Sequence, residues 1–213
     1  MNIGGYLPFS LSDYPGCPAA IVFTQGCNFR CPFCHNNALI EIKAGSIPAT
    51  EVLSSLANRR KFLQGVVISG GEPCLQNGIE DFCASVKELG LRVKLDTNGS
   101  RPDVLIRLIN AGCVDYVAMD VKAPPGRYHV LSGIEVNWNT MEESMRALTA
   151  SGIPHHFRTT NVTPLLSLKD IGEIVGHLPL GSKHVLQEFR RELARDSWLR
   201  TRSAQNEVCE LPG

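Results

Sequence analysis

Short apolar runs alternate with longer amphipathic segments along most of the chain. Each run has the length and composition of a buried strand, whereas each longer segment spaces its apolar residues as a helix does. Ile79, Phe82, Cys83 and Val86, for example, share one helical face. Strands are expected at residues 19–24, 65–69, 91–95, 115–121, 155–160 and 184–189. Helices are expected at residues 49–63, 79–89, 102–110, 140–150 and 168–178.

This alternation predicts right-handed βαβ units, and therefore an α/β fold built on a parallel sheet. Two architectures fit the pattern: an open doubly wound sheet, or a curved, partial (β/α)6 barrel. Periodicity does not separate them, but both place ligands at the carboxyl ends of the strands. We expect one domain over residues 1–213, with a core at about 19–189, an N-terminal segment at 1–18 and a C-terminal tail at 190–213.

Composition narrows the class of protein. The 213 residues are 43% hydrophobic and 20% charged, which is typical of a soluble globular domain. The chain has 21 Lys and Arg residues and 21 Asp and Glu residues. With no net charge, it is not expected to have an electrostatic field that attracts nucleic acid or an acidic membrane. No apolar run reaches the roughly 18–20 residues that span a bilayer. Residues 1–6 do not resemble a signal peptide, so a cytoplasmic location is expected.

Three of the eight cysteines stand close together, where Cys27, Cys31 and Cys34 form a C-x3-C-x2-C motif after the first predicted strand. In a reducing cytosol, clustered cysteines indicate metal ligands. A four-iron cluster is usually held by four cysteines, one on each iron. Three thiolates would therefore leave one iron open for another ligand. A Cys3His zinc site that includes His35, or a set of ordinary buried thiols, also fits. The remaining cysteines form no second ligand pattern: Cys17, Cys74, Cys83, Cys113 and Cys209. We expect Cys83 to lie in the core.

Polar or glycine-rich sequence also follows each later strand. The motifs are Gly70-Gly71-Glu72-Pro73, Asp96-Thr97-Asn98-Gly99, Asp120-Val121-Lys122, Arg158-Thr159-Thr160 and Gln187-Glu188. The first four have ordinary structural explanations: a turn for the glycine pair, a turn and helix cap for residues 96–99, an ion pair for Asp120 and Lys122, and a solvated side chain for Arg158. Since the carboxyl ends of parallel strands meet at one edge of the sheet, we expect these motifs and the cysteine motif to line the same pocket opening there.

The cysteine motif followed by a strand-borne Gly-Gly-Glu-Pro resembles the radical S-adenosylmethionine (SAM) superfamily. Within it, the chain is similar to the activases of glycyl radical enzymes, and in particular to the anaerobic ribonucleoside-triphosphate reductase activating proteins. The similarity covers about residues 4–189 and rests on the sequences at 12–16, 22–36, 95–99, 119–122 and 185–189. It implies the partial (β/α)6 barrel, with parallel strands and outer helices.

The resemblance also implies a role for each motif. Cys27, Cys31 and Cys34 would ligate three irons of one [4Fe–4S] cluster, SAM would chelate the fourth, and Phe33 would pack near the adenine. The other implied SAM contacts are Gly70, Gly71 and Glu72 for the amino group; Asp96, Thr97, Asp120 and Lys122 for the carboxylate and ribose; Arg158 for the carboxylate or ribose; and Gln187 near the adenine. In related activases some of these acids also bind a monovalent cation, a role that would fall on Asp96, Thr97 and Asp120.

The implied reaction is reductive cleavage of SAM to a 5′-deoxyadenosyl radical, which abstracts hydrogen from a glycine of a partner glycyl radical enzyme. An anaerobic ribonucleotide reductase is the expected partner, and a flavodoxin or ferredoxin the expected electron donor. Two alternatives stay open. One is a small-molecule enzyme similar to 7-carboxy-7-deazaguanine synthase, which would need a cap over its substrate. The other is a zinc or iron–sulfur binding module without catalysis. We expect Cys17 and Cys74 to be bystanders, and the basic tail at 190–213 to be a solvated helix or a docking surface.

Overall fold

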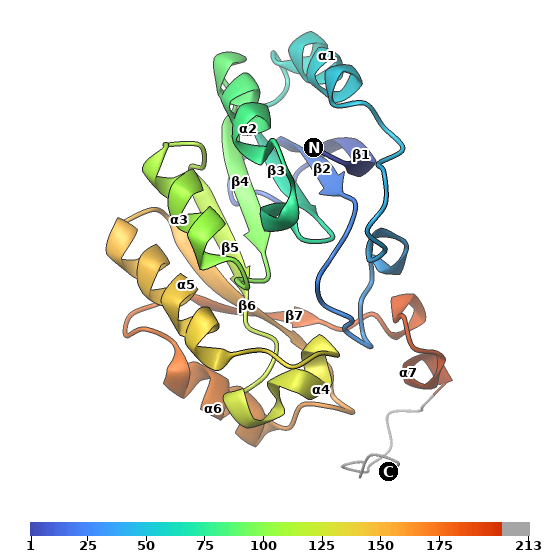
Figure 1. Cartoon of the computed structure of the whole chain (residues 1–213), viewed down its shortest axis with the longest axis vertical. Helices are drawn as coiled ribbons and strands as arrows, with labels where there is room; N and C mark the ends of the chain where they lie inside the picture. The colour runs from blue at the N-terminus through green and yellow to red at the C-terminus, as the bar shows by residue number, and fades with distance from the viewer. Residues whose placement is uncertain (202–213) are drawn as a thin grey trace.

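The structure, a computed structural model, describes residues 1–201, in which seven strands form one sheet in sequential order (Figure 1). The first pair is antiparallel, and every later pair is parallel. The strands are β1 (Ile3–Ser10), β2 (Ala19–Thr24), β3 (Gly65–Gly70), β4 (Arg92–Thr97), β5 (Tyr116–Asp120), β6 (His155–Asn161) and β7 (His184–Glu188).

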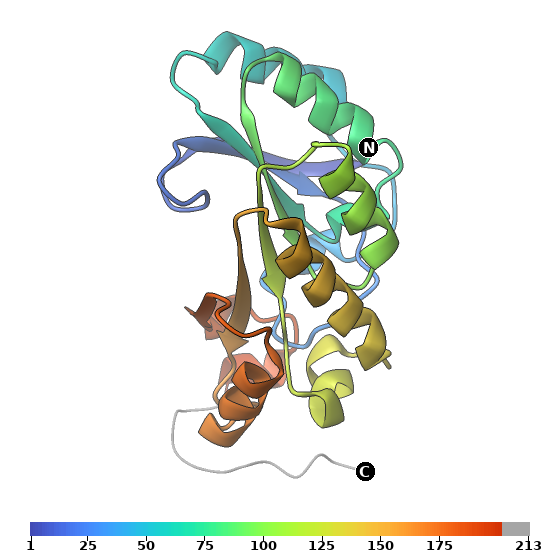
Figure 2. The same cartoon turned by 90° about the vertical axis from the view of Figure 1, so that its left-hand side faces the viewer.

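The helices follow the strands as crossovers, and Figure 2 shows α2, α3 and α5 side by side on one face of the sheet. The helices are α1 (Ala49–Arg59), α2 (Ile79–Glu88), α3 (Pro102–Asn110), α4 (Tyr128–Ser132), α5 (Trp138–Ser151), α6 (Leu168–His177) and α7 (Ser197–Thr201). The 3-10 turns are η1 (Asn37–Leu39), η2 (Pro73–Leu75), η3 (Pro125–Arg127) and η4 (Arg191–Leu193).

Strand order decides between the two predicted architectures. In a doubly wound sheet the order reverses at a switch point, whereas in a barrel the strands follow one another. Here the order is sequential, and within the described part of the chain β1 and β7 do not pair. The prediction of a partial barrel with parallel strands and outer helices is therefore confirmed.

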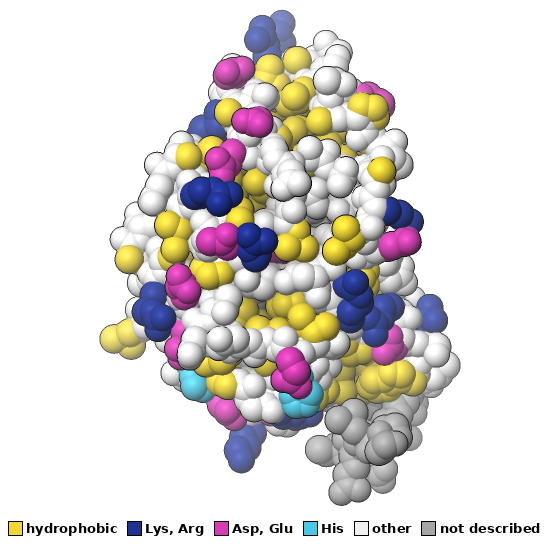
Figure 3. Space-filling view, viewed as in Figure 1, with side chains coloured by type: hydrophobic (Ala, Val, Ile, Leu, Met, Phe, Trp, Pro, Cys, Tyr) yellow, Lys and Arg dark blue, Asp and Glu magenta, His cyan; other side chains and the backbone are white. Residues whose placement is uncertain are grey.

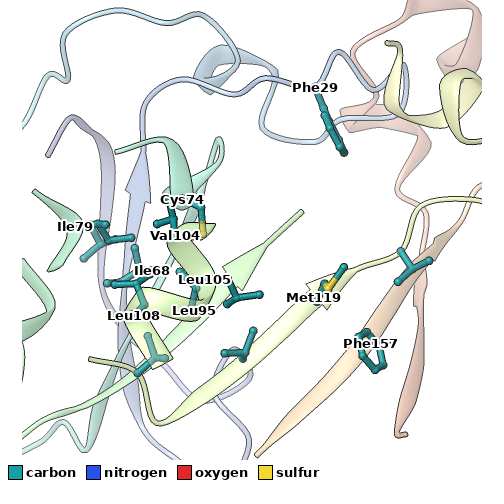
Figure 4. Packing of buried hydrophobic residues seen from close by; sticks show 14 of the residues in the cluster. Phe29, Ile68, Cys74, Ile79, Leu95, Val104, Leu105, Leu108, Met119 and Phe157 are labelled. Carbon is teal, nitrogen blue, oxygen red and sulfur yellow. The ribbon is translucent and has the colours of Figure 1, made fainter. Parts of the chain in front are cut away.

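The strands β2 to β5 are largely buried on both faces, with side chains that alternate between them, whereas β1 and β7 are mostly half-buried or exposed. In β2, Ala20 and Val22 belong to the main core beneath the helices, while Ala19 and Ile21 join Tyr14 in a smaller cluster on the opposite face. Figure 4 shows part of the main core, including Leu95, Met119 and Phe157 from three strands. Cys83 lies in this core and is fully buried, as predicted.

Three features of the fold differ from the sequence-based expectation. Strand β1 was not predicted, because Gly4, Gly5 and Pro8 obscure its pattern; an edge strand tolerates both residue types. The five-residue helix α4 was also missed. The tail does not form one solvated helix over residues 190–201, since it contains η4 and α7 and buries Leu199 completely. The rest of the tail, with Cys209, lies outside the described residues.

Two further observations concern the helices and the charged side chains. None of the helices in residues 1–201 combines the length and the apolar character that a membrane-spanning segment requires. Figure 3 shows basic and acidic side chains interspersed over the face in view. That distribution agrees with equal totals of the two charges in the sequence.

Candidate functional site

The residues predicted from the strand ends lie together in one open pocket at the carboxyl ends of the parallel strands. Every residue with an implied site role lines it: Cys27, Cys31, Phe33, Cys34, Gly70, Gly71, Glu72, Asp96, Thr97, Asp120, Lys122, Arg158 and Gln187. Five other residues of the strand-end motifs do not line it: Pro73, Gly99, Val121, Thr159 and Glu188. The topology explains this gathering, because β2 to β7 all end at the same edge of the sheet.

The cysteine loop, residues 27–36, contributes three thiols to the pocket and has no helix or strand of its own. Its start is held by the next segment, since the backbone N–H of Gly26 donates to the carbonyl of Leu39 at 2.8 Å and that of Cys27 to the carbonyl of Ile40 at 3.0 Å. The N–H of Phe29 donates to the Cys27 sulfur at 3.3 Å. Phe29 itself is buried, and although it lies on the loop it belongs to the same hydrophobic cluster as the residues packed around the sheet (Figure 4).

Burial keeps these thiols protonated unless a metal replaces the proton. It raises the pKa of Cys27 to about 12 and that of Cys31 to about 11, and it also raises the pKa of Cys34. The positive charge of Lys122 opposes the rise in the pKa of all three. The three cysteines are free, so a soft metal centre fits their chemistry, and its binding would release protons.

In this structure His35 does not join the three cysteines in the alternative Cys3His zinc site. His35 is engaged by the segment after β7, where its ring stacks on Phe189 with the centroids 5.8 Å apart, and its Nε2 accepts a hydrogen bond from the backbone N–H of Arg190. Within residues 1–201 no three His, Cys, Asp or Glu side chains converge on a position for a single metal ion. Three cysteines that line one pocket supply the thiolate ligands that iron–sulfur clusters take.

Gly70 and Gly71 are required by a close approach between two backbones. A Cβ atom at Gly71 would lie 2.2 Å from the carbonyl oxygen of Gly26, and one at Gly70 would lie 2.3 Å from the backbone nitrogen of Thr24. The N–H of Gly71 donates to the carbonyl of Thr24, and that of Glu72 to the carbonyl of Gly26. The glycine pair therefore joins the end of β3 to the cysteine loop.

Glu72 is buried and its carboxylate serves the protein itself. It accepts hydrogen bonds from the backbone N–H of Cys74 at 2.9 Å, the Thr97 hydroxyl at 2.7 Å and the backbone N–H of Asn98 at 2.7 Å. Burial nevertheless raises its pKa. The Glu72 and Thr97 side chains thus tie the ends of β3 and β4 together. Thr97 also donates weakly to the buried Cys74 sulfur, at 3.5 Å.

A network of charges covers the floor of the pocket. Arg158 bridges the carboxylates of Asp120, at 2.5 Å, and Asp96, at 3.1 Å. Asp120 also pairs with Lys122 at 3.2 Å, and Asp96 pairs with Lys94. The predicted ion pair is thus present, and Arg158, with 15% of its side chain exposed, is not a solvated surface residue.

This network sets the charge of its members. Burial alone would raise the pKa of Asp120, but the positive charges of Arg158 and Lys122 hold it well below its usual range. Burial alone would lower the pKa of Lys122, but the negative charge of Asp120 raises it above its usual range. Both groups are therefore charged at neutral pH, and across the network three cations face two carboxylates. Lys122 also lies over the Phe33 ring, 5.7 Å from its centroid.

Side-chain amides connect the predicted motif at residues 96–99 to the cysteine loop. The Asn98 side-chain amide donates to the Asn28 side-chain oxygen at 2.9 Å, and Asn28 donates to Ser100 at 2.8 Å, which connects the cysteine loop to the end of β4. Thr160, from the predicted motif at residues 158–160, lines the pocket as well. Ser69 also lines it and was not predicted, although strand alternation could have found it, since its hydroxyl lies on the same face as Asp96 and donates to it at 3.3 Å. His35, which the sequence offered as a possible zinc ligand, lines the pocket too, and the other lining residues that were not predicted are Phe29, Asn36 and Ile40.

Comparison with known proteins gives a family and a set of relatives. The sequence model described as Radical SAM superfamily matches residues 21–178. A Methanocaldococcus jannaschii protein named "Putative glycyl-radical enzyme activating enzyme" is 31% identical over 98% of this chain and 89% of its own length. The 7-carboxy-7-deazaguanine synthase of Hyperthermus butylicus is 37% identical over 47% of this chain and 41% of its own length.

A solved structure gives the same fold. Streptococcus suis SuiB, in a crystal structure bound to S-adenosylmethionine, superimposes with a TM-score of 0.62 at 16% identity. The match covers 78% of this chain and 39% of SuiB. The chain thus spans less than half the length of that structure, and the likeness concerns the fold alone.

Proposed function

The chain belongs to the Radical SAM superfamily, and from this premise we propose that it is an activase that generates a glycyl radical on a partner enzyme. One observation carries the proposal: the similarity to the M. jannaschii activating enzyme extends over 98% of this chain. We further propose that residues 1–213 act as a single radical SAM domain.

The three cysteines of the pocket fit a [4Fe–4S] cluster. When bound and reduced, such a cluster supplies the electron that splits SAM into methionine and a 5′-deoxyadenosyl radical. Cys27, Cys31 and Cys34 would hold three of its irons. The pocket would exclude bulk water from this chemistry through the buried rings of Phe29 and Phe33.

The remaining pocket groups suit the two charged ends of the amino-acid part of SAM. The N–H groups of Gly71 and Glu72 already donate within the protein, so the glycine pair offers its carbonyl oxygens, which are acceptors for an amino group. Lys122 and Arg158 bring positive charge into the pocket, and we assign them to the carboxylate. Phe33, Thr97 and Gln187 would then contact the adenosine part.

Glu72, Asp96 and Asp120 act in this proposal through the groups they hold. Glu72 positions the ends of β3 and β4, while the two aspartates keep Lys122 and Arg158 in place. The monovalent cation predicted at Asp96, Thr97 and Asp120 would compete with these cations for the carboxylates. Dependence of SAM affinity on potassium or sodium would test that prediction.

A second pocket supports a protein segment as the substrate. It shares Asp96, Arg158 and Gln187 with the first pocket, and it extends to Asp13, in the loop before β2, and to Lys183, just before β7. Since β1 and β7 do not pair in the described residues, the barrel is open on this side. A loop of a partner enzyme could therefore reach the site laterally.

We propose an anaerobic ribonucleotide reductase as the partner and a flavodoxin or ferredoxin as the electron donor, in the cytoplasm. The test is anaerobic incubation of the reconstituted protein with SAM, a reductant and a candidate reductase, followed by EPR spectroscopy. A doublet from a glycyl radical that requires all components supports the proposal. SAM cleavage without a radical on this reductase would reject this partner, and other glycyl radical enzymes could then be screened.

The similarity to 7-carboxy-7-deazaguanine synthase favours one second candidate, a small-molecule radical SAM enzyme. It covers 47% of this chain for one such synthase and 65% for another, against 98% for the M. jannaschii protein, which is why we rank it lower. The substrate of the synthase, supplied with SAM and reductant, separates the two. Conversion to the deazaguanine product, together with no radical on any partner, would favour this candidate.

A further inference from the structure

The segment that follows β7 lies against the cysteine loop. We call residues 189–199 the C-terminal clasp. The Phe189 ring stacks on His35 with an interplanar angle of 8°, and the N–H of Arg190 donates to His35 Nε2 at 3.3 Å. Since His35 directly follows Cys34, these contacts hold the end of the cysteine motif. Figure 1 shows this part of the chain, up to α7, beside the descending cysteine loop.

Two more contacts hold the backbone on both sides of the central cysteine. Arg195 Nη1 donates to the carbonyl of Arg30 at 2.5 Å, and the N–H of Asp196 donates to the carbonyl of Pro32 at 2.9 Å. Arg30 precedes Cys31 and Pro32 follows it. Arg195 Nε also donates to the Asp196 carboxylate at 2.7 Å, which orients the guanidinium group.

The clasp is anchored in the core, so it can hold the loop firmly. Ala194 and Leu199 have no exposed surface and belong to the main hydrophobic cluster. On its other side the loop is held by α4, where the N–H of Arg30 donates to the carbonyl of Ser132 at 2.7 Å. The cysteine loop, which lacks regular secondary structure, is therefore held by hydrogen bonds with α4 on one side and with the C-terminal clasp on the other.

We propose that the C-terminal clasp fixes Cys31 and Cys34 in the geometry that binds the cluster, with Arg195 as the positioning residue, and that it slows the loss of iron. This inference rests on the proposed function through the cluster. Groups around the ligands of a metal site orient the ligands, and their loss typically weakens metal binding. The clasp contacts hold the ligand backbone from a segment more than 150 residues away in sequence.

The test compares Arg195→Ala with Arg200→Ala. Arg200 lies in α7, close to the clasp, and its side chain makes no hydrogen bond or ion pair with the residues that the structure describes. Both variants are reconstituted anaerobically, and the release of iron to a ferrous chelator is followed by absorbance. Loss of a hydrogen bond from a charged donor should make release about tenfold faster in Arg195→Ala. Arg200→Ala should behave as the wild type, and Arg195→Lys should restore part of the retention.

Two further measurements keep the inference falsifiable. Thermal unfolding of the iron-free variants checks the fold, and the EPR spectrum of the reduced cluster reports its geometry. Wild-type release rates and an unchanged spectrum in Arg195→Ala would overturn the clasp while leaving the proposed function intact. A wild-type protein that takes up no iron would overturn both. If Arg195→Ala does not fold, Phe189→Leu removes the ring stacking on His35 and should also accelerate iron release.

Discussion

Replacing Asp120 by asparagine should destabilise the protein because it removes one of two carboxylates that neutralise three cations. Asp120 accepts from Arg158 at 2.5 Å and from Lys122 at 3.2 Å. With an uncharged amide in its place, Lys94, Lys122 and Arg158 would share the single negative charge of Asp96. The side chains of Lys122 and Arg158 are only 13% and 15% exposed, so water would compensate little.

The size of the effect follows from the burial of the pair. At an effective dielectric constant of about 20, two unit charges about 4 Å apart attract by about 4 kcal/mol. The cost of desolvation cancels much of this attraction while the pair is intact, but removing one partner from a buried pair costs roughly 3–5 kcal/mol. Because 26% of the Asp120 side chain is exposed, we expect the lower end, about 3 kcal/mol.

The assay is urea unfolding of the iron-free protein, followed by circular dichroism. Asp103→Asn is the matched control, since Asp103 pairs with Arg101 at 2.8 Å but 55% of its side chain is exposed. That pair should contribute at most about 1 kcal/mol. Equal losses of stability in the two variants would refute the reasoning, because burial would then have no influence on how much an ion pair contributes to stability.

The same variant has a predicted pH dependence. The pKa of Asp120 is lower in the folded protein than the value of about 3.9 in an unfolded chain. The charged carboxylate therefore stabilises the folded state above about pH 4, and this contribution is lost as the pH falls further. The difference in unfolding free energy between wild type and Asp120→Asn should be constant from about pH 7 to about pH 5 and shrink below about pH 4. A difference that grows on acidification would contradict the assignment.

Three further substitutions, one of them with a matched control, are measured by the same unfolding assay. Gly71→Ala would place a Cβ 2.2 Å from the Gly26 carbonyl oxygen and should cost about 1–3 kcal/mol; an unchanged midpoint would mean that the backbones can separate freely. Gly172→Ala, in α6 with open space around it, should instead stabilise by about 1 kcal/mol, and a loss would contradict helix propensity as the dominant effect there. Ser144→Ala removes a buried hydrogen bond of 2.7 Å to the Gly99 carbonyl and should cost about 1–2 kcal/mol, whereas Ser151→Ala, at the partly exposed end of the same helix, should cost less.

The sequence predicts the pocket well because periodicity fixes where each strand ends. Asp96, Asp120 and Arg158 come from three different strands, yet parallel pairing brings their carboxyl ends to one edge. The same logic could not show what Glu72 does. Its carboxylate is occupied by donors from residues 74, 97 and 98, and the partner groups on β4 are fixed only by the three-dimensional packing.

Contacts between distant segments were beyond the reach of pattern analysis. The clasp meets the cysteine loop across more than 150 residues, and nothing in the arginine-rich tail indicates which arginine contacts the loop. Lys94 is a milder case. It lies inside a strand between Val93 and Leu95, so alternation could have indicated a polar inner face, but not that this lysine is 2% exposed and paired with Asp96.

The most direct test of the central claim is the formation of 5′-deoxyadenosine. The protein is reconstituted anaerobically with iron and sulfide, reduced with dithionite and incubated with SAM, with Cys31→Ala as the control. We predict that the wild type gains absorbance near 400 nm and forms 5′-deoxyadenosine, while Cys31→Ala does neither. A wild-type protein that binds zinc and forms no 5′-deoxyadenosine, or a Cys31→Ala variant that still cleaves SAM, would contradict the assignment of this pocket.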